Sequence, residues 1–158
     1  MNNRPSWQQY FMRMAFLAST RSTCLRRAVG AALVRDNQIL STGYNGSPKS
    51  SPHCKDVGCL REQLKVPSGE KHELCRGVHA EQNAIIQAAI NGSSTRNAVM
   101  YCTHQPCSIC AKMIINAEIR QVFIANTYPD ELCLELFREA DIELILLDPD
   151  TGNQKRIV

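Results

Sequence analysis

Three side chains in two short stretches have the types and spacing of a metal site. His79 supplies an imidazole, and Cys107 and Cys110 supply two thiols three residues apart. Two thiolates and an imidazole can hold a tetrahedral Zn²⁺ with the fourth position open, whereas a structural zinc site would need another protein ligand. Glu81, two residues after the histidine, is then expected to carry protons rather than to bind the metal.

Together these residues form the pattern His-x-Glu … Pro-Cys-x-x-Cys, which is the signature of zinc-dependent nucleobase deaminases. In such a site Glu81 would take a proton from the attacking water and deliver it to the ring nitrogen and the leaving amine. A Cys-x-x-Cys pair alone is often half of a structural zinc site or a redox pair. The preceding proline and the earlier His-x-Glu favour the catalytic interpretation.

The elements that would position these residues alternate between strands and helices. A first helix begins after Ser6, a hairpin follows, and His79 opens a helix that ends at Asn91 and Gly92. Strands are predicted over residues 29–34, 38–44, 98–103, 121–125 and 142–147, with later helices over 107–117 and 130–140. Residues 151–158 are predicted to be a polar tail. The pattern predicts one domain over residues 1–158, a three-layer α/β/α sandwich around a mixed five-stranded sheet.

Residues 45–78 lack periodicity and contain several prolines and glycines. A structureless loop of this length is unusual in a compact domain unless something orders it. The segment is rich in potential metal ligands, namely His53, Cys54, Cys59, His72 and Cys75. A second bound metal would order it.

The composition excludes several classes of protein. The chain has 158 residues, 44% hydrophobic and 21% charged, with a net charge of +3. This charge is too small to indicate a nucleic-acid-coating surface. Residues 1–5 lack the apolar core of a secretory signal, and no run is long enough to span a membrane. We therefore expect a cytoplasmic protein without nucleic-acid or membrane partners, whose eight cysteines favour metal binding over disulfides, with Cys102 and Cys133 as core residues.

Several further stretches make the chain resemble the deoxycytidylate (dCMP) deaminase family, including its bacterial late-competence-operon branch. The similarity extends from about Trp7 to Leu147. The stretches are Trp7-x-x-Tyr10-Phe11-Met12, Arg21-Ser22-Thr23-Cys24, Val29-Gly30-Ala31, residues 41–48 (STGYNGSP), His53-Cys54-Lys55-Asp56-x-Gly58-Cys59, residues 79–85 (HAEQNAI) and Thr103-His104-x-Pro106-Cys107-x-x-Cys110.

The resemblance implies hydrolysis of dCMP to dUMP and ammonia, which supplies dUMP for dTMP synthesis. It also implies a cytidine deaminase-like fold and a homohexamer. Activation by dCTP with Mg²⁺ and inhibition by dTTP are further implications.

The resemblance also implies roles for individual residues. His79, Cys107 and Cys110 would hold the catalytic zinc, and Glu81 would be the proton shuttle. A second, structural zinc would be held by Cys24, Cys54, His72 and Cys75, with Cys59 and His53 as rival ligands. The spacing between His72 and Cys75 is wider than the adjacent His-Cys pair expected for the branch.

Substrate contacts are expected around the motif residues. Asn45 would bind the sugar or the base, although a turn asparagine before Gly46 explains it equally well. Tyr128 would pack on the nucleotide or merely initiate a turn before proline. Ala80 is also expected to contact the substrate, because it lies between His79 and Glu81 in the motif. The candidates for binding the phosphate are Arg26, Arg27 and Arg76. Each of these arginines could equally be an ordinary surface side chain that is solvated by water.

Two alternatives use the same motifs. Another zinc deaminase, acting on tRNA adenosine, free nucleosides, guanine or a riboflavin precursor, would share the metal site. A tRNA enzyme would need a more basic surface and would lack the cysteine-bearing loop. A non-catalytic, zinc-stapled binding module or competence accessory would not need Glu81.

Overall fold

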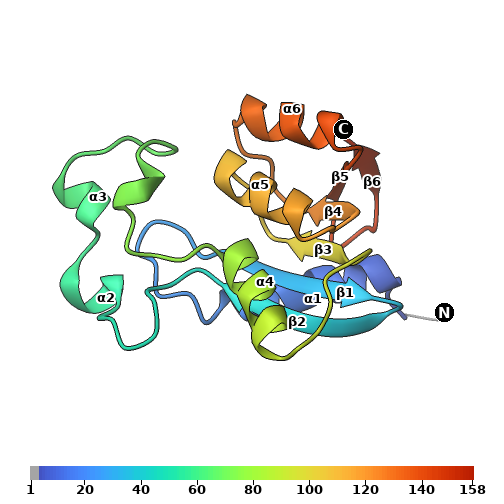
Figure 1. The fold of residues 1–158 in the computed structure, drawn as a ribbon, viewed down its shortest axis with the longest axis horizontal. Helices are drawn as coiled ribbons and strands as arrows, with labels where there is room; N and C mark the ends of the chain where they lie inside the picture. The colour runs from blue at the N-terminus through green and yellow to red at the C-terminus, as the bar shows by residue number, and fades with distance from the viewer. Residues whose placement is uncertain (1–3) are drawn as a thin grey trace.

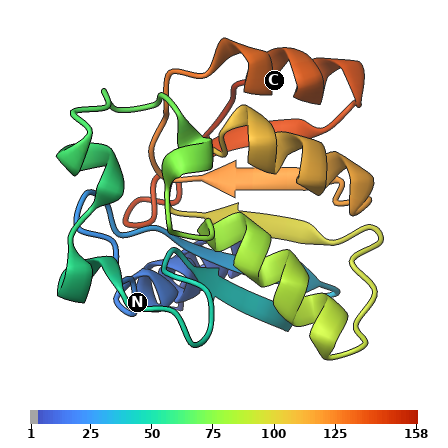
Figure 2. The ribbon, with the colours of Figure 1, turned by 60° about the vertical axis from the view of Figure 1, so that its left-hand side comes forward.

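The computed structural model of the protein describes residues 4–158 as a mixed β-sheet with helices on both faces (Figures 1 and 2). The strand order is β2-β1-β3-β4-β5-β6. The strands are β1 (Gly30–Arg35), β2 (Gln38–Tyr44), β3 (Val99–Cys102), β4 (Gln121–Ile124), β5 (Glu143–Leu147) and β6 (Gln154–Arg156). The main helices are α1 (Trp7–Ser19), α4 (Ala80–Ile90), α5 (Ser108–Asn116) and α6 (Glu131–Glu139).

The sheet has six strands, so the prediction of five is wrong. The hairpin of β1 and β2 pairs antiparallel with β3, and β3, β4 and β5 run parallel. The additional strand β6 pairs antiparallel with β5 and comes from the predicted polar tail. Its three residues are all exposed at the sheet edge, so backbone pairing forms the strand without any apolar alternation in the sequence.

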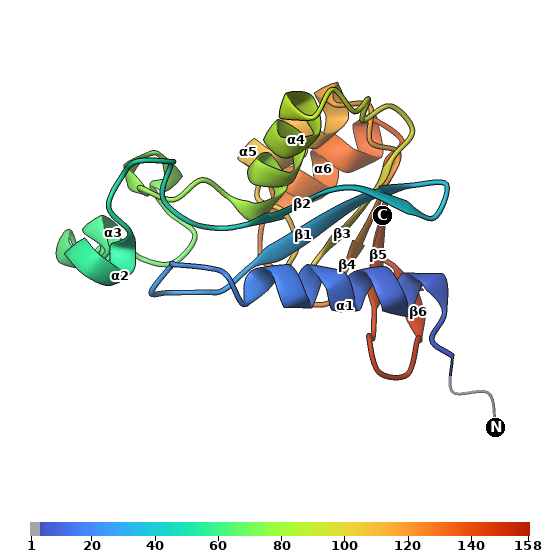
Figure 3. The same ribbon diagram turned by 90° about the horizontal axis from the view of Figure 1, so that it is seen from below.

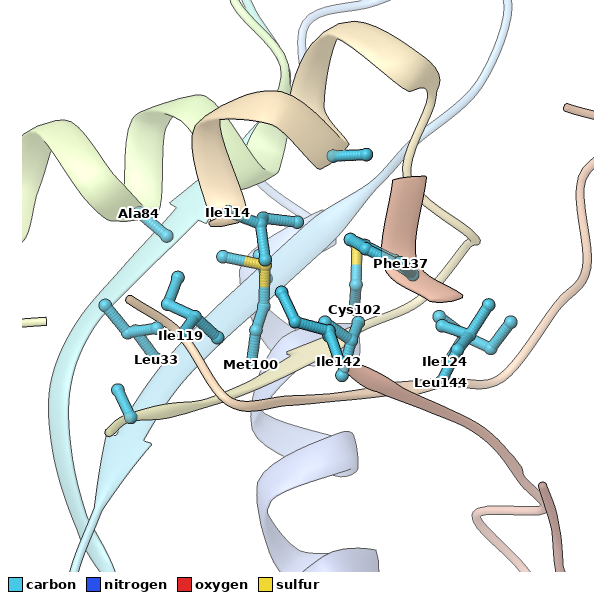
Figure 4. Packing of buried hydrophobic residues seen from close by; sticks show 14 of the residues in the cluster. Leu33, Ala84, Met100, Cys102, Ile114, Ile119, Ile124, Phe137, Ile142 and Leu144 are labelled. Atoms are coloured by element: carbon cyan, nitrogen blue, oxygen red, sulfur yellow. The ribbon is translucent and has the colours of Figure 1, made fainter. Parts of the chain in front are cut away.

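The three predicted layers are confirmed. Seen from below, α1 covers one face of the sheet, and α4, α5 and α6 cover the other (Figure 3). The larger core fills the space between the sheet and these three helices, where Met100, Ile114, Phe137 and Leu144 are fully buried (Figure 4). This packing fixes the beginnings of α4 and α5, from which the metal-ligand motif emerges.

Helix α1 begins as its sequence predicts. The Ser6 hydroxyl accepts a hydrogen bond from the Gln9 backbone, while the Gln9 side chain accepts one from the Ser6 backbone. This reciprocal capping box satisfies two backbone donors that the helix leaves free.

The cysteine-bearing segment projects beyond one end of the sheet (Figure 1). It was expected to lack regular structure, but it contains the short helices α2 (Cys54–Val57), α3 (Leu60–Gln63) and η1 (His72–Leu74). Helices of three or four residues are too short to show a hydrophobic periodicity in the sequence. An isolated bridge between Gly46 and Val78 joins the two ends of the segment, so it leaves and re-enters the domain at one place. Among the described residues, no helix is long and apolar enough to cross a membrane.

Candidate functional site

His79, Cys107 and Cys110 converge between the starts of two helices. His79 is the N-cap of α4 and Cys107 is the N-cap of α5. Nδ1 of His79 lies 3.5 Å from Sγ of Cys107 and 3.3 Å from Sγ of Cys110. Within residues 4–158 this is the one group of three His, Cys, Asp or Glu side chains whose ligand atoms all lie within 4.8 Å.

The spacing of these atoms fits a zinc ion. Zn–S bonds of about 2.3 Å and Zn–N bonds of about 2.0 Å at tetrahedral angles separate nitrogen and sulfur by about 3.5 Å. The two observed nitrogen–sulfur distances match this edge. The three predicted ligands are therefore brought together with the geometry that a tetrahedral ion requires.

Hydrogen bonds at the helix starts hold the ligands in place. The backbone N–H of His79 donates to Oε1 of Gln82 at 2.8 Å. Asp130 connects α5 with α6, because its two carboxylate oxygens accept from Ser108 N at 2.8 Å and Cys133 N at 3.0 Å. The sequence predicts Asp130 as the start of a helix, but not its second bond next to Cys107.

One thiol of the Cys107–Cys110 pair loses its proton easily. A hydrogen bond from Cys110, together with one involving His79, lowers the pKa of Cys107 to about 4. Conversely, the hydrogen bond with Cys107 and burial raise the pKa of Cys110. One thiolate forms readily in this pair, and a cation is needed to stabilise the second.

Glu81 lies in the first turn of α4 with only 4% of its surface exposed. Burial raises the pKa of Glu81, and the charge of nearby His79 opposes this rise. A carboxyl group with a raised pKa holds a proton more readily than a free one, which suits it to both accept and donate a proton, as a proton shuttle must.

His79, Glu81 and Cys107 line a cavity of about 470 Å³, within the size range of small-molecule sites. Four residues predicted to contact substrate, Asn45, Ala80, Tyr128 and Arg26, line the same cavity. The structure therefore places all of them around one space, although Asn45 and Tyr128 are far apart in sequence.

The side chain of Asn45 is largely occupied by the protein itself. Its Oδ1 accepts hydrogen bonds from Ser22 Oγ at 2.6 Å and from Val29 N at 2.9 Å, and its Nδ2 donates to Arg27 O at 2.7 Å. These bonds attach the loop before β1 to the end of β2. One N–H of the amide remains available to a ligand.

Tyr128 and Arg27 form part of the rim. The guanidinium of Arg27 lies 5.4 Å from the centre of the Tyr128 ring, in cation–π contact. His104 lines the cavity nearby, with its Nδ1 3.0 Å from the Thr103 hydroxyl. Burial and the charge of Arg27 lower the pKa of His104, which favours a neutral imidazole at this rim.

The predicted ligands of a second zinc lie along another wall of the same cavity. Cys24, Cys54, His72 and Cys75 all line it, and so does the rival Cys59, but within residues 4–158 no three of their ligand atoms all lie within 4.8 Å of one another. The thiols are neighbours: burial, and then the charges of Cys24, Cys59 and Cys75, raise the pKa of Cys54. Nδ1 of His72 is buried without a hydrogen-bond partner in the described structure.

Comparison with known proteins agrees with this geometry. The sequence profile described as the cytidine and deoxycytidylate deaminase zinc-binding region matches residues 5–126. The chain belongs to this family. It is 40% identical over 148 residues to ComE operon protein 2 of Bacillus subtilis, covering 93% of this chain and 74% of that protein. It is 38% identical over 142 residues to deoxycytidylate deaminase of Schizosaccharomyces pombe, covering 89% of this chain but only 44% of that protein.

A solved structure shares the fold of this family member. The dCMP deaminase of cyanophage S-TIM5, crystallised with dCMP and dUMP, superposes with a TM-score of 0.72 and 29% identity. The match covers 89% of this chain and 96% of that chain. The predicted cytidine deaminase-like fold is confirmed.

Sequence reasoning missed Arg61 and Gln105, which also line the cavity. Arg61 lies in a segment without periodicity, so nothing in the sequence separates it from a solvated arginine. Gln105 occupies the variable position of the His104-x-Pro106 stretch, yet its Oε1 accepts from Tyr128 N at 3.3 Å.

Proposed function

We propose that the protein hydrolyses dCMP to dUMP and ammonia. The observation that carries this proposal is the buried carboxyl of Glu81 beside the converging His79, Cys107 and Cys110, at a cavity of nucleotide size. The proposal is supported by membership of the family and by the cyanophage relative, whose crystals contain dCMP and dUMP.

His79, Cys107 and Cys110 would hold a zinc ion. When bound, zinc would acidify a coordinated water so that it can attack carbon 4 of the cytosine ring near neutral pH. Glu81 would accept one proton from that water and give it to the ring nitrogen, and then move the second proton from the new hydroxyl on carbon 4 to the amine. Protonation of the amine allows it to leave as ammonia, and the water oxygen remains as the carbonyl of uracil.

Asn45, Ala80, Tyr128 and Arg26 are proposed to bind the substrate. Asn45 retains one N–H for a ligand. Ala80, at the first turn of α4, offers backbone at a helix start. Nη1 of Arg26 is buried without a hydrogen-bond partner in the described structure, so it can receive an anionic oxygen.

A structural zinc is proposed for the cysteine-bearing segment, with Cys24, Cys54 and Cys75 as ligands and His72 as the fourth. Backbone N–H groups two residues further along donate to two of these sulfurs, from Arg26 to Cys24 and from Gly77 to Cys75, each at 3.4 Å. Such bonds stabilise thiolates that bind a metal. Cys59 and His53 are the rival ligands.

The family resemblance further supports a cytoplasmic homohexamer of such single-domain chains that supplies dUMP for dTMP synthesis. Activation by dCTP with Mg²⁺ and inhibition by dTTP complete the proposal. Sedimentation and assays with each effector test these points separately from the chemistry.

The deciding experiment measures ammonia release from dCMP, dCTP, cytidine and tRNA by the zinc-loaded protein. We expect dCMP to be the preferred substrate by kcat/KM and dUMP to be the product. Turnover of tRNA or of the free nucleoside alone would assign a different deaminase, and a protein inert toward all four would contradict the enzymatic function.

A further inference from the structure

Arg61 is a buried cation that has no counter-ion in the described part of the chain. It lies in α3, has 8% of its surface exposed and lines the cavity of the proposed active site. Within residues 4–158 the two ion pairs join Arg96 to Glu118 and Arg156 to Glu143, and neither involves Arg61.

The hydrogen bonds of the Arg61 guanidinium are only partly satisfied. Nη2 donates to the carbonyl oxygen of Pro67 at 3.2 Å, whereas Nε is buried without a partner in the described structure. Removing a charged donor from water is unfavourable unless a hydrogen-bonding anion replaces the water. Arg61 therefore has an unused donor and an unused charge at the wall of a ligand cavity.

The position of Arg61 suits a ligand that also reaches the metal-ligand motif. The side chains of Arg61 and His79 line the same cavity, and the positive charge of Arg61 slightly opposes the rise in the pKa of His79 that its hydrogen bond with Cys107 causes. The guanidinium of Arg61 is therefore close enough to interact electrostatically with His79, although Arg61 belongs to the segment of residues 45–78 and not to the sheet or its covering helices.

We propose that Arg61 binds the 5′-phosphate of the substrate and makes the site select a nucleoside monophosphate over the free nucleoside. This inference rests on the proposed deaminase function. A guanidinium presents donors in a planar fork that matches phosphate oxygens, and such charge-assisted bonds are strong in a cavity shielded from water. Arg26, with its own unpartnered Nη1 at the same cavity, provides a second donor.

The other two arginines at the cavity are less suited to this task. Arg27 and Arg76 are both exposed, and Arg27 already stacks on Tyr128. Exposed cations are hydrated and screened, so they discriminate weakly between ligands. Arg61 is the more deeply buried donor, and this favours it as the specificity-determining residue.

The test compares dCMP with deoxycytidine in the wild type and in Arg61→Gln. We expect the variant to raise KM for dCMP roughly 10- to 100-fold with little change in kcat, as for the loss of a charged hydrogen bond. Turnover of deoxycytidine should stay within about threefold, since this nucleoside has no phosphate to lose. Binding of dUMP, measured by calorimetry, should weaken by the same factor as KM rises.

Two further variants separate recognition from folding. Arg61→Lys keeps the charge but not the fork, so its KM for dCMP should lie between those of the wild type and Arg61→Gln. If Arg61→Gln fails to fold, the selective defect of Arg61→Lys toward dCMP carries the test. Arg35→Gln is the matched control, because Arg35 donates to the carbonyls of Ser94 and Arg96 outside the cavity.

An equal loss toward dCMP and deoxycytidine would show that Arg61 only supports the fold and would overturn the inference. Unchanged binding of dCMP would overturn it as well. A wild type that binds dUMP through Arg61 but deaminates nothing would instead contradict the proposed function and leave Arg61 as a phosphate ligand.

Discussion

Gly43 of β2 lies directly against the first turn of α4, so that a Cβ atom on Gly43 would come 2.2 Å from the carbonyl oxygen of Ala80. The same Cβ would lie 2.5 Å from the backbone nitrogen of Ala84. Both contacts are with backbone, which cannot rotate away. The absence of a side chain at Gly43 therefore sets the distance between the sheet and the helix that carries His79 and Glu81.

Gly43→Ala should move α4 and damage the site. We expect a loss of about 3 kcal/mol in the free energy of unfolding, at the upper end of overpacking effects. The activity of the remaining folded protein should fall with it, because His79 and Glu81 move away from the two cysteines. Urea unfolding, zinc content and dCMP turnover measure these effects together.

Gly92→Ala is the matched control for this prediction. Gly92 follows α4 with a φ of 69°, and a Cβ there meets nothing within 4 Å. The substitution should cost about 1 kcal/mol of left-handed backbone strain and leave turnover per folded molecule unchanged. Equal effects of the two variants on turnover would refute the importance of the close approach at Gly43.

Glu81→Gln should separate metal binding from chemistry. The amide has nearly the same shape as the carboxyl but cannot transfer protons, so kcat should fall roughly 10²- to 10⁴-fold or more. Zinc content should remain that of the wild type, because Glu81 is not one of the three converging ligands. Glu118→Gln, which alters an exposed carboxylate paired with Arg96, serves as the control.

Substantial turnover by Glu81→Gln with zinc still bound would assign proton transfer to another group. If neither the wild type nor Glu81→Gln deaminates any substrate and both keep their biological function, the protein is better described as a non-catalytic zinc-binding module.

The parts of this protein that sequence could predict are those with local causes. The Ser6 cap, the helix starts at His79 and Cys107, and the turn at Asn91 each depend on residues within a few positions. The metal ligands were predictable because their spacing, Cys107 to Cys110 on one turn, is itself local. The side-by-side placement of α4 and α5 then follows from adjacent strands in an α/β sheet.

The parts that sequence could not predict depend on long-range pairing. Strand β6 forms through backbone bonds to β5, and its exposed side chains carry no signal. Asn45 holds residues around 20 positions away through its amide. Arg61 differs from other arginines only by its burial, which arises from the way the inserted segment folds back.

Stability at high pH should depend on Tyr101. Its ring stacks on Phe123 with centroids 4.9 Å apart, and burial raises the pKa of Tyr101 to about 12. Between about pH 10 and about pH 12 the unfolded chain has lost this proton while the folded protein keeps it. The folded state then binds more protons, so stability falls as pH rises, by about 1.4 kcal/mol per pH unit.

The measurement is the difference in unfolding free energy between the wild type and Tyr101→Phe across this pH range. Comparing the two removes the contributions of lysines and other groups that they share. Tyr10→Phe alters an exposed tyrosine of α1 and should keep the wild-type slope. If Tyr101→Phe loses stability as steeply as the wild type, burial of the phenol is not the cause.

The proposed second zinc should be detectable in the number of zinc ions bound per chain. We expect about two zinc ions per wild-type chain and about one in Cys75→Ser, since a hydroxyl is a poor replacement for thiolate. Without its metal the segment of residues 45–78 loses the cross-link between its ends, so limited proteolysis should cut there first. Plasma mass spectrometry of the purified protein and mapping of the first cleavage measure both effects.

Cys133→Ser provides the control, because Cys133 is a fully buried thiol of α6 whose pKa burial raises to about 12. It should lower stability and leave the zinc count unchanged, which distinguishes loss of a ligand from loss of a packed sulfur. A wild type with about one zinc per chain would mean that the short turns α2, α3 and η1 order the segment without a metal. In that case the thiols of Cys24, Cys54 and Cys75 would remain free, and alkylation of the folded protein would modify the partly exposed Cys24 and Cys75.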